Sequence, residues 1–313
     1  MKRIFLIITV IIVGCNNYLK DRSEVFDLII EEYNIHCDSL DLNSLYKHYK
    51  SNQYIPITIE NNNIEQIGSM RIRGDSSRDY DKKSLKVKIK EPLSISNKSV
   101  FNFNAEYSDK SFLRSFLSSM IFKQLNYPCF SASFSKLYIN NNYHGLFLEI
   151  ENMDRDFLKM NGLNPNGDLF KATKDGACLH DIKEIDHKWE KKTNKQSAMI
   201  NLERLIDDIN KTPSEDFYDY VQKNFNYPML IDFLAINAFI ANGSTYYHNY
   251  YLYRDQENDG KWILLPWDLD KTISYYDWKP YMYHSTSSDW ENDNSLIEKC
   301  FLNETIFNDF KKR

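Results

Sequence analysis

Residues 70–90 read Met-Arg-Ile-Arg-Gly-Asp-Ser-Ser-Arg-Asp-Tyr-Asp-Lys-Lys-Ser-Leu-Lys-Val-Lys-Ile-Lys. Apolar and cationic side chains alternate over residues 70–73 and again over 84–90, which is the pattern of strands with one buried face. In the second run one face carries Leu85, Val87 and Ile89, and the other carries Lys86, Lys88 and Lys90. A Gly/Ser turn lies between the runs, so the stretch predicts two strands joined by a turn.

Patterns on either side of this stretch indicate the rest of the fold. Further strands are predicted over residues 54–59, 134–139, 146–150, 168–171, 250–253 and 262–265. Helices are predicted over residues 110–125, 199–209 and 227–241, and from about residue 294 onward. Because strands dominate the first part of the chain and helices the second, we expect an α+β fold.

Composition narrows the function classes. The chain has 313 residues, with 39 Lys and Arg against 44 Asp and Glu, which gives a net charge of −5. This balance argues against a nucleic-acid partner held by a basic face. Only nine residues are glycine, and no G-x-G-x-x-G motif occurs. The stretch nearest to a Walker A loop, residues 162–169, has Asp-Leu where Lys-Ser/Thr is required, so any nucleotide must be held by another arrangement.

The N-terminus predicts export. Residues 1–14 combine a positive end, a short apolar run and a small residue, which is typical of a signal peptide. The run ending in Ile-Val-Gly before Cys15 resembles a bacterial lipobox, which implies lipidation of Cys15 and a membrane-anchored protein of the cell envelope, outside the cytoplasm. An uncleaved anchor or an ordinary secretory signal are the alternatives. For the other cysteines both disulfides and free buried thiols stay open: Cys37, Cys129, Cys178 and Cys300.

Two motifs suggest a phosphate and metal site. In the turn after Arg73, the backbone N–H groups around Gly74 and Ser76, with lysines close by, are typical of an anion site, and a solvated basic hairpin is the alternative. Asp268 and Asp270 follow an apolar strand, where carboxylates two residues apart commonly bind Mg²⁺, and turn-forming aspartates are the alternative.

Acidic side chains also lie at the end of a predicted strand. Glu149 and Glu151 share one face of it, opposite Ile150. One of the two carboxylates could pair with a lysine in a cleft. The alternative is that both lie on a solvent-facing edge.

Taken in order, five stretches resemble the CotH family of atypical protein kinases, named for spore coat protein H. The matching stretches are residues 71–88, 113–114, 143–154, 168–171 and 249–272, within a similarity that covers roughly residues 50–310. The resemblance implies a two-lobed kinase-like fold that binds ATP and Mg²⁺ (or Mn²⁺) and phosphorylates Ser or Thr hydroxyls of a protein substrate. The expected division is a tether with a helical segment over 15–50, a sheet-rich lobe over 51–177, a charged connector over 178–196 and a helix-rich lobe over 197–313.

The resemblance also assigns roles to cofactor-binding residues. It implies that Lys83 contacts the phosphates, with Lys88 and Arg73 as supporting cations. It implies that Glu151 orients a lysine or the metal. Lys171 is expected to close the nucleotide cleft.

The metal and catalytic residues follow in the second half. By resemblance Asn249 and Asp268 hold the metal, with Asp270 beside them. Where family members commonly carry an Asp ahead of the Asn-Tyr-Tyr-Leu-Tyr strand, this chain has Ser244, which cannot take a proton from a substrate. Asp270 is the candidate to replace it. The chain also ends inside a predicted helix where the family usually continues, which leaves the completeness of the second lobe open.

Three functions therefore stay open. The first is an envelope protein kinase. The second is a catalytically silent relative (a pseudokinase) that acts as a surface binding or structural module. The third is a hydrolase that uses Asp268 and Asp270 on another substrate without nucleotide.

Overall fold

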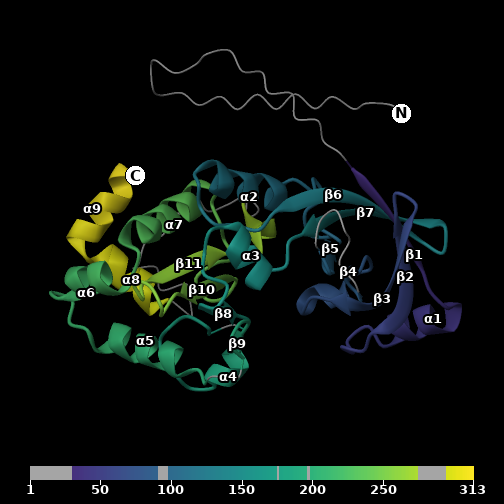
Figure 1. Ribbon diagram of the computed structural model, residues 1–313. Coiled ribbons are helices and arrows are strands. Elements are labelled where there is room, and N and C mark those ends of the chain that lie inside the picture. The colour runs from purple at the N-terminus through teal and green to yellow at the C-terminus, as the bar shows by residue number, and fades with distance from the viewer. Residues whose placement is uncertain (1–29, 91–97, 175, 196–197, 274–293) are drawn as a thin grey trace, which may run out of the picture.

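The computed structural model describes residues 30–90, 98–174, 176–195, 198–273 and 294–313. The predicted signal segment and Cys15 lie outside these residues. Within them, buried apolar side chains form one hydrophobic core inside a first sheet and another around a second sheet. The fold is a mixed α/β arrangement built on these two sheets (Figure 1).

The first sheet is a barrel of seven strands among the described residues. The strands are β1 (Glu31–His36), β2 (Ile55–Asn61), β3 (Ile64–Arg73), β4 (Ser84–Ile89), β5 (Val100–Asn104), β6 (Ala132–Ile139) and β7 (Asn142–Ile150). They follow the order β1-β2-β3-β4-β5-β7-β6, and a parallel pairing of β1 with β6 closes the barrel. The other neighbours are antiparallel. Closure pairs both edges of the sheet, which removes the exposed edge strands of an open sheet.

The barrel interior confirms the alternation predicted for residues 84–90. Leu85 and Val87 are fully buried and Ile89 is nearly so, whereas Lys86 is half-buried and Lys88 is exposed. The cations of this strand therefore lie on the outer wall of the barrel. Helix α1 (Ser39–Lys47) packs near β2 and β3 at one end of the barrel and contributes buried Leu45 to its core.

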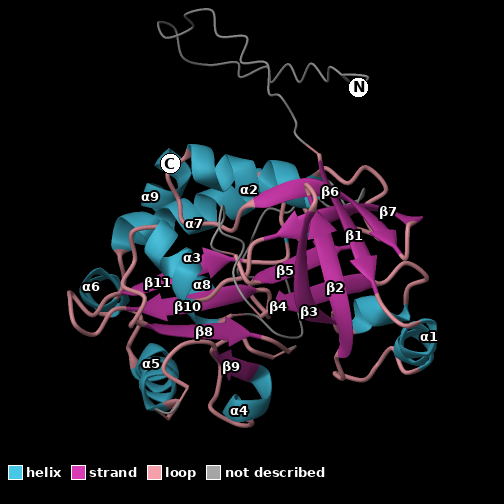
Figure 2. Cartoon of the chain, turned by 45° about the vertical axis from the view of Figure 1, so that its right-hand side comes forward, coloured by secondary structure: helices cyan, strands magenta, loops and turns pink. Residues whose placement is uncertain are grey.

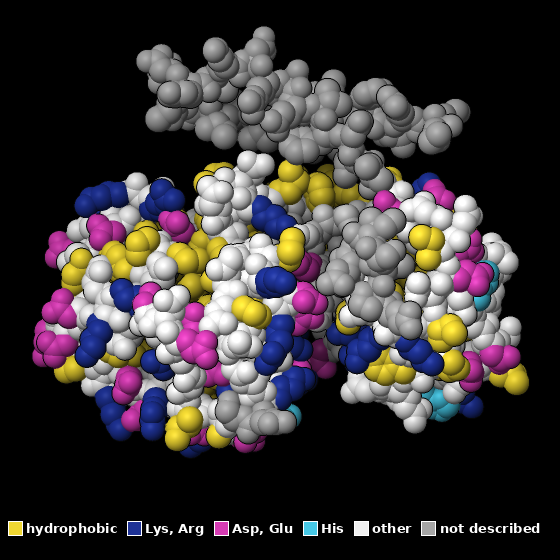
Figure 3. Space-filling view, viewed as in Figure 1, with side chains coloured by type: hydrophobic (Ala, Val, Ile, Leu, Met, Phe, Trp, Pro, Cys, Tyr) yellow, Lys and Arg dark blue, Asp and Glu magenta, His cyan; other side chains and the backbone are white. Residues whose placement is uncertain are grey.

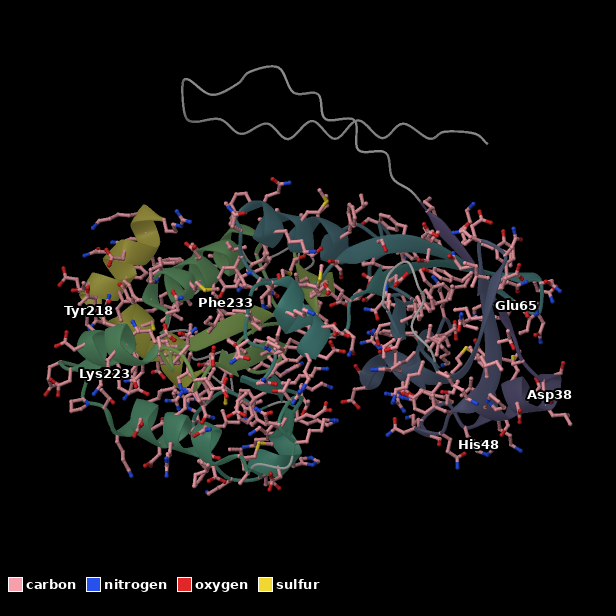
Figure 4. The ribbon with its side chains drawn as sticks, viewed as in Figure 1. Asp38, His48, Glu65, Tyr218, Lys223 and Phe233 are labelled. Carbon is pink, nitrogen blue, oxygen red and sulfur yellow. The ribbon has the colours of Figure 1, made fainter. Side chains whose placement is uncertain are left out.

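Within the part of the chain that the structure describes, the second sheet has four antiparallel strands in the order β11-β10-β8-β9. Its strands are β8 (Asp168–Ala172), β9 (Trp189–Lys191), β10 (Tyr250–Arg254) and β11 (Trp262–Pro266). Helices gather around it (Figure 2): α3 (Arg155–Met160), α4 (Ile185–Lys188), α5 (Ile200–Lys211), α6 (Phe217–Asn224), α7 (Tyr227–Phe239), α8 (Ser295–Leu302) and α9 (Glu304–Lys312). Figure 4 places Phe233 of α7 on this side of the molecule, far from Asp38, His48 and Glu65 of the barrel.

The structure corrects several boundaries expected from the sequence. Residues 31–36, expected in the tether, form β1 of the barrel. Strand β8 belongs to the second sheet although it precedes residue 177, and the expected connector over 178–196 contributes α4 and β9 to that same part. The helix expected from about residue 294 is divided at Asn303, whose side chain accepts a hydrogen bond from Ile306 N and caps α9.

Helix α2 (Arg114–Gln124) differs from the amphipathic helix expected over 110–125. It begins four residues later, because Phe112 has a left-handed backbone (φ 61°) that a helix cannot contain. Its buried side chains are mostly small: Ser115, Ser118, Ser119 and Phe122. Ser118 Oγ lies 2.7 Å from Thr272 Oγ1, so small residues let α2 approach the short 3₁₀ helix η2 (Leu269–Lys271), which carries Asp270.

The cysteines of the described residues are free thiols, which answers the question left open by their spacing: Cys37, Cys129, Cys178 and Cys300. All but Cys37 are buried. Among the described helices, none has the length and hydropathy that a membrane crossing requires.

Candidate active site

A cleft separates the barrel from the part built on the second sheet (Figure 3). Lys and Arg side chains flank it on both sides, and Asp and Glu side chains lie beside them. On the barrel side the relevant strands are β3 and β4, which carry Arg73 and Lys86. On the other side the strands are β8 and the β10–β11 pair.

The register of β10 and β11 brings two predicted residues to one edge of the second sheet. Tyr250, the first residue of β10, pairs with Pro266, the last residue of β11. Asn249 directly precedes Tyr250, and Asp268 follows Pro266 by two residues. Asn249 and Asp268 therefore leave the sheet at the same end, as the prediction of a shared metal site requires.

Three cations from both sides interact with one another, and two of them, Arg73 and Lys171, also interact with Asp268 at this edge. Arg73 interacts electrostatically with Asp268, and burial lowers the pKa of its guanidinium. Burial, followed by repulsion from Arg73, lowers the pKa of Lys86 to about 7. The same two causes lower the pKa of Lys171 on β8 to about 8. Cations that repel one another in this way are stabilised by a bound anion, and a polyphosphate supplies several negative charges at once.

Neighbouring groups hold these cations in place. The Arg73 guanidinium donates to Asn104 Oδ1 at the end of β5. Lys86 Nζ donates to Asn152 Oδ1 at 3.3 Å, and Asn152 lies in the link between the barrel and α3. Lys171 Nζ lies 5.0 Å from the ring centroid of Trp267, which follows β11. The cationic cluster is therefore fixed by both halves of the molecule.

A group of carboxylates lies beside the cations. Asp270 Oδ2 accepts a hydrogen bond from Ser108 Oγ at 2.8 Å, while its Oδ1 is buried without a hydrogen-bond donor among the described residues. Burial, followed by repulsion from Asp268, raises the pKa of Asp270 to about 7. Burial and then repulsion from Asp270 raise the pKa of Glu106 to about 8. Negative charge is crowded here, which a bound cation would relieve.

Backbone strain gathers at the same place. Left-handed φ angles occur at Glu106 (45°), Asn249 (62°), Asp268 (57°) and Ile273 (51°). A β-branched residue such as Ile273 pays a steric cost in this conformation. Residues held in sparsely populated conformations cluster at functional sites, where the surrounding structure imposes them.

The residues at this edge fit a hard divalent cation that keeps several non-protein ligands. Among the described residues, no three His, Cys, Asp or Glu side chains are grouped so as to hold a metal by themselves. Mg²⁺ is usually bound by one or two carboxylates together with substrate phosphates and water, which does not require such a group. Asn249 Nδ2 donates to the carbonyl and hydroxyl oxygens of Ser244 at 3.0 and 2.8 Å. Its Oδ1 is thereby directed away from Ser244, and with Asp268 it can serve as an oxygen ligand.

Comparison with known proteins identifies the family of the chain. A family model described as CotH kinase protein matches residues 70–313. The chain belongs to the CotH family. It is 28% identical over 248 residues to the inner spore coat protein H of Bacillus subtilis (strain 168), which covers 77% of this chain and 68% of that protein. The range matched by the family model begins just before Arg73 and includes each of the cations and carboxylates described above.

Some residues assigned by resemblance to the CotH family lie outside the cluster. Lys83 Nζ donates to the carbonyl of Arg78 at 2.6 Å and lies 4.4 Å from the ring centroid of Tyr49. Lys88 is exposed, and its Nζ lies 4.9 Å from the ring centroid of Tyr54. The position of Lys83 does not support the expected phosphate contact, and Lys86 joins Arg73 instead. The alternation of residues 84–90 already placed Lys86 on the outer wall.

Glu149 in β7 and Glu151, which directly follows β7, have different surroundings. Glu149 is 3% exposed and lies inside the barrel, where it accepts hydrogen bonds from Tyr33 Oη and Ser135 Oγ and pairs with Lys98. The solvent-facing alternative is therefore wrong for Glu149. Glu151 is half-buried, and its Oε2 accepts from Ser131 N at 2.9 Å. The structure does not bring Glu151 to the cationic cluster.

The Gly/Ser turn folds as a 3₁₀ helix, η1 (Ser76–Asp79). Gly74 has φ 108°, which favours glycine, and its carbonyl accepts from Arg78 Nε at 2.7 Å. Ser76 is exposed. Asp75 pairs with Lys174 Nζ at 2.6 Å, so the turn reaches the segment that follows β8. Of the residues predicted for anion binding at this turn, Arg73 at its base lies in the cationic cluster.

Proposed function

We propose that this CotH-family protein is an ATP-dependent kinase that transfers phosphate to Ser or Thr hydroxyls of envelope or coat-like proteins. One observation carries the proposal. Arg73 and Lys171 interact electrostatically with Asp268, and Lys86 interacts with Arg73, so cations from three separate strands form one group beside Asp268. Phosphoryl transfer needs cations for the phosphates, oxygen ligands for a metal and a group that positions the hydroxyl, and this edge offers all three.

The residues divide these roles by their position. Arg73, Lys86 and Lys171 bind the phosphates. Asp268 and Asn249 Oδ1 would hold Mg²⁺ or Mn²⁺, which when bound neutralises charge on the transferring phosphate. Asp270 Oδ1 is buried without a donor among the described residues and is the atom best placed to accept the proton of the substrate hydroxyl.

Two measurements test the proposal. The mature chain is incubated with labelled ATP, Mg²⁺ or Mn²⁺ and a Ser-rich protein, and label transfer is measured. The melting temperature is measured with and without ATP, because a ligand that binds only the native state raises it. The kinase proposal requires both transfer and a rise in melting temperature. Absence of transfer with both metals contradicts it, whether or not ATP raises the melting temperature.

A catalytically silent relative is the second candidate, and Ser244 favours it. Ser244 is 1% exposed, and its hydroxyl accepts from Asn249 Nδ2. By resemblance a carboxylate commonly stands here in the family. A serine can orient Asn249 but cannot act as a base. Such a protein would keep nucleotide binding and serve as a surface binding or structural module.

Substitution of Ser244 by aspartate separates the two candidates. An aspartate here can still accept from Asn249 Nδ2, and it adds the missing carboxylate at the same edge. If the native chain is silent, we expect S244D to raise label transfer at least about 100-fold, the lower end of the range for a positioned acid–base group. S244A is the control, since it removes the hydroxyl and adds no carboxylate. Equal transfer by the native chain and S244D would show that Ser244 does not limit catalysis.

Nucleotide affinity is expected to fall as pH rises from 7 to 9. The pKa values of Lys86 and Lys171 are about 7 and 8, so each ammonium loses its charge in this range. Bound phosphate favours the charged form, so binding takes up protons and weakens above each pKa, by at most about tenfold per pH unit for each lysine. Titration with a fluorescent ATP analogue measures the effect.

The variant K86R provides the control for this pH dependence. Arginine stays charged throughout the range, so the slope of affinity against pH should become shallower. An unchanged slope would mean that Lys86 does not contact the phosphates.

We also propose that the protein is a lipoprotein of the bacterial envelope, held outside the cytoplasm through Cys15. The support is the signal-like segment over residues 1–14 and the small residue before Cys15. Acylation of this thiol would give the chain its membrane partner.

A further inference from the structure

The segment from Asn104 to Ser108 contacts both charged groups of the site. At its start, Asn104 Oδ1 accepts from the guanidinium of Arg73, which belongs to the cations. At its end, Ser108 Oγ donates to Asp270 Oδ2 at 2.8 Å, which belongs to the carboxylates. One short connector therefore sets the position of the cations relative to the carboxylates.

The connector is firmly held by the barrel. Ala105 N donates to Ser84 Oγ at 2.9 Å, and Lys82 Nζ donates to the carbonyl of Ala105 at 3.0 Å. Glu106 is 6% exposed and has φ 45°. Its Oε2 accepts from Ser115 Oγ of α2 at 3.1 Å, and its Oε1 accepts from Asn104 Nδ2 at 3.4 Å. A buried carboxylate beside Asp270 in a strained conformation is costly, so its retention calls for a role.

The contact between Asn104 and Glu106 decides which end of the Asn104 amide faces Arg73. An asparagine side chain has a donor at one end and an acceptor at the other, and a rotation of 180° exchanges them. If Nδ2 faced Arg73, two donors would oppose each other and the guanidinium would lose its partner. Glu106 takes Nδ2 and thereby presents Oδ1 to Arg73.

We propose that Glu106 is a positioning residue for phosphate binding: through Asn104 it orients the Arg73 guanidinium toward the nucleotide. The inference rests on the proposed function, because it takes Arg73 as a phosphate ligand. Glu106 itself does not touch the nucleotide in this scheme.

The test compares E106A and E106Q by their affinity for a fluorescent ATP analogue with Mg²⁺. E106A leaves the Asn104 amide without its orienting acceptor, and we expect affinity to fall about tenfold, a usual cost of removing a group that orients a ligand-binding side chain. E106Q keeps an amide oxygen that accepts from Asn104 Nδ2, so affinity should stay within about threefold of the native value. Melting temperatures are measured for both variants.

The variant S135A is the matched control. Ser135 lies on β6, is fully buried and donates to Glu149 Oε2 inside the barrel at 3.3 Å, so its loss also removes a buried hydrogen bond. Its affinity for the nucleotide should remain native while its melting temperature falls.

The possible outcomes are distinct. At a pH above the Glu106 pKa of about 8, a purely electrostatic effect of Glu106 would make both E106A and E106Q bind the anionic nucleotide more tightly, which would overturn the positioning role. Equal losses of affinity in E106A and S135A would also overturn it, because they would reflect destabilisation alone. If the native chain binds no nucleotide with either metal, the proposed function fails before the role of Glu106 is reached.

Discussion

Replacement of Asp268 by asparagine is expected to lower the rate of phosphate transfer about 100-fold to 1000-fold, the range seen when a preorganised charge at a reacting centre is removed. Asp268 has φ 57°, and asparagine tolerates this left-handed conformation, so the backbone at the edge of the second sheet should stay in place. The change removes the negative charge that faces Arg73 and would hold the metal. The rate of label transfer from ATP at saturating metal concentration, compared between D268N and the native chain, measures this effect.

The variant D259N is the matched control for D268N. Asp259 lies in the exposed turn between β10 and β11, where its Oδ1 accepts from Lys261 N. The same chemical change there should leave transfer at the native rate. Native transfer by D268N would exclude Asp268 from the reaction and with it the metal site at this edge.

The largest expected effect on stability comes from Asp168 at the start of β8. Asp168 and Lys191 form an ion pair of 2.9 Å, and their side chains are 2% and 5% exposed. Asn201 Nδ2 also donates to this carboxylate at 2.9 Å. Substitution by alanine leaves a buried ammonium without its counter-charge, so D168A should lower the free energy of unfolding by about 3–5 kcal/mol. Urea denaturation monitored by tryptophan fluorescence measures it.

The contribution of Asp168 to the free energy of unfolding depends on pH. Burial alone would raise the pKa of Asp168, but hydrogen bonds from Lys191 and Asn201 outweigh it and the pKa is lowered. A lowered pKa in the folded state means that the stabilisation is present above the usual Asp pKa of about 4 and is lost as pH falls below it.

The variant D207A gives the comparison. Asp207 pairs with Lys211 at 2.6 Å on the exposed face of α5, with side chains 53% and 74% exposed. An exposed pair contributes little, so D207A should change the free energy of unfolding by less than about 1 kcal/mol. Similar losses in D168A and D207A would mean that burial of the Asp168 pair adds nothing to stability.

Much of the sheet architecture could be predicted from the sequence, because half-buried strands alternate in hydrophobicity. Residues 84–90, 134–139 and 146–150 show this and form β4, β6 and β7. Strand β1 was not predicted from the sequence. Glu31–His36 has only two buried apolar residues, Tyr33 and Ile35, which is too short a pattern to recognise. Its pairing with β6 is set by residues far along the chain, which local patterns do not reveal.

The candidate site was predicted in part for similar reasons. Asp268 was predicted because it follows a recognisable strand, whereas Asn249 was predicted only through the resemblance to the CotH family. Lys86 could have been found from its alternation with Leu85 and Val87, but only the structure shows which cations face Arg73. Glu106 had no signal in the sequence, since it lies in an irregular connector and acquires its role through contacts with α2 and β5.

The parallel pairing between β1 and β6 has a consequence for how the chain folds. Glu31 pairs with Ser135, about a hundred residues later, so the first strand to be synthesised finds its second neighbour only after most of the barrel exists. Such distant pairings slow folding, because the loss of chain freedom precedes the gain in contacts. Until β6 arrives, β1 has one free side that can pair with another chain. The chain before β6 has paired, rather than the finished protein, is therefore most exposed to aggregation.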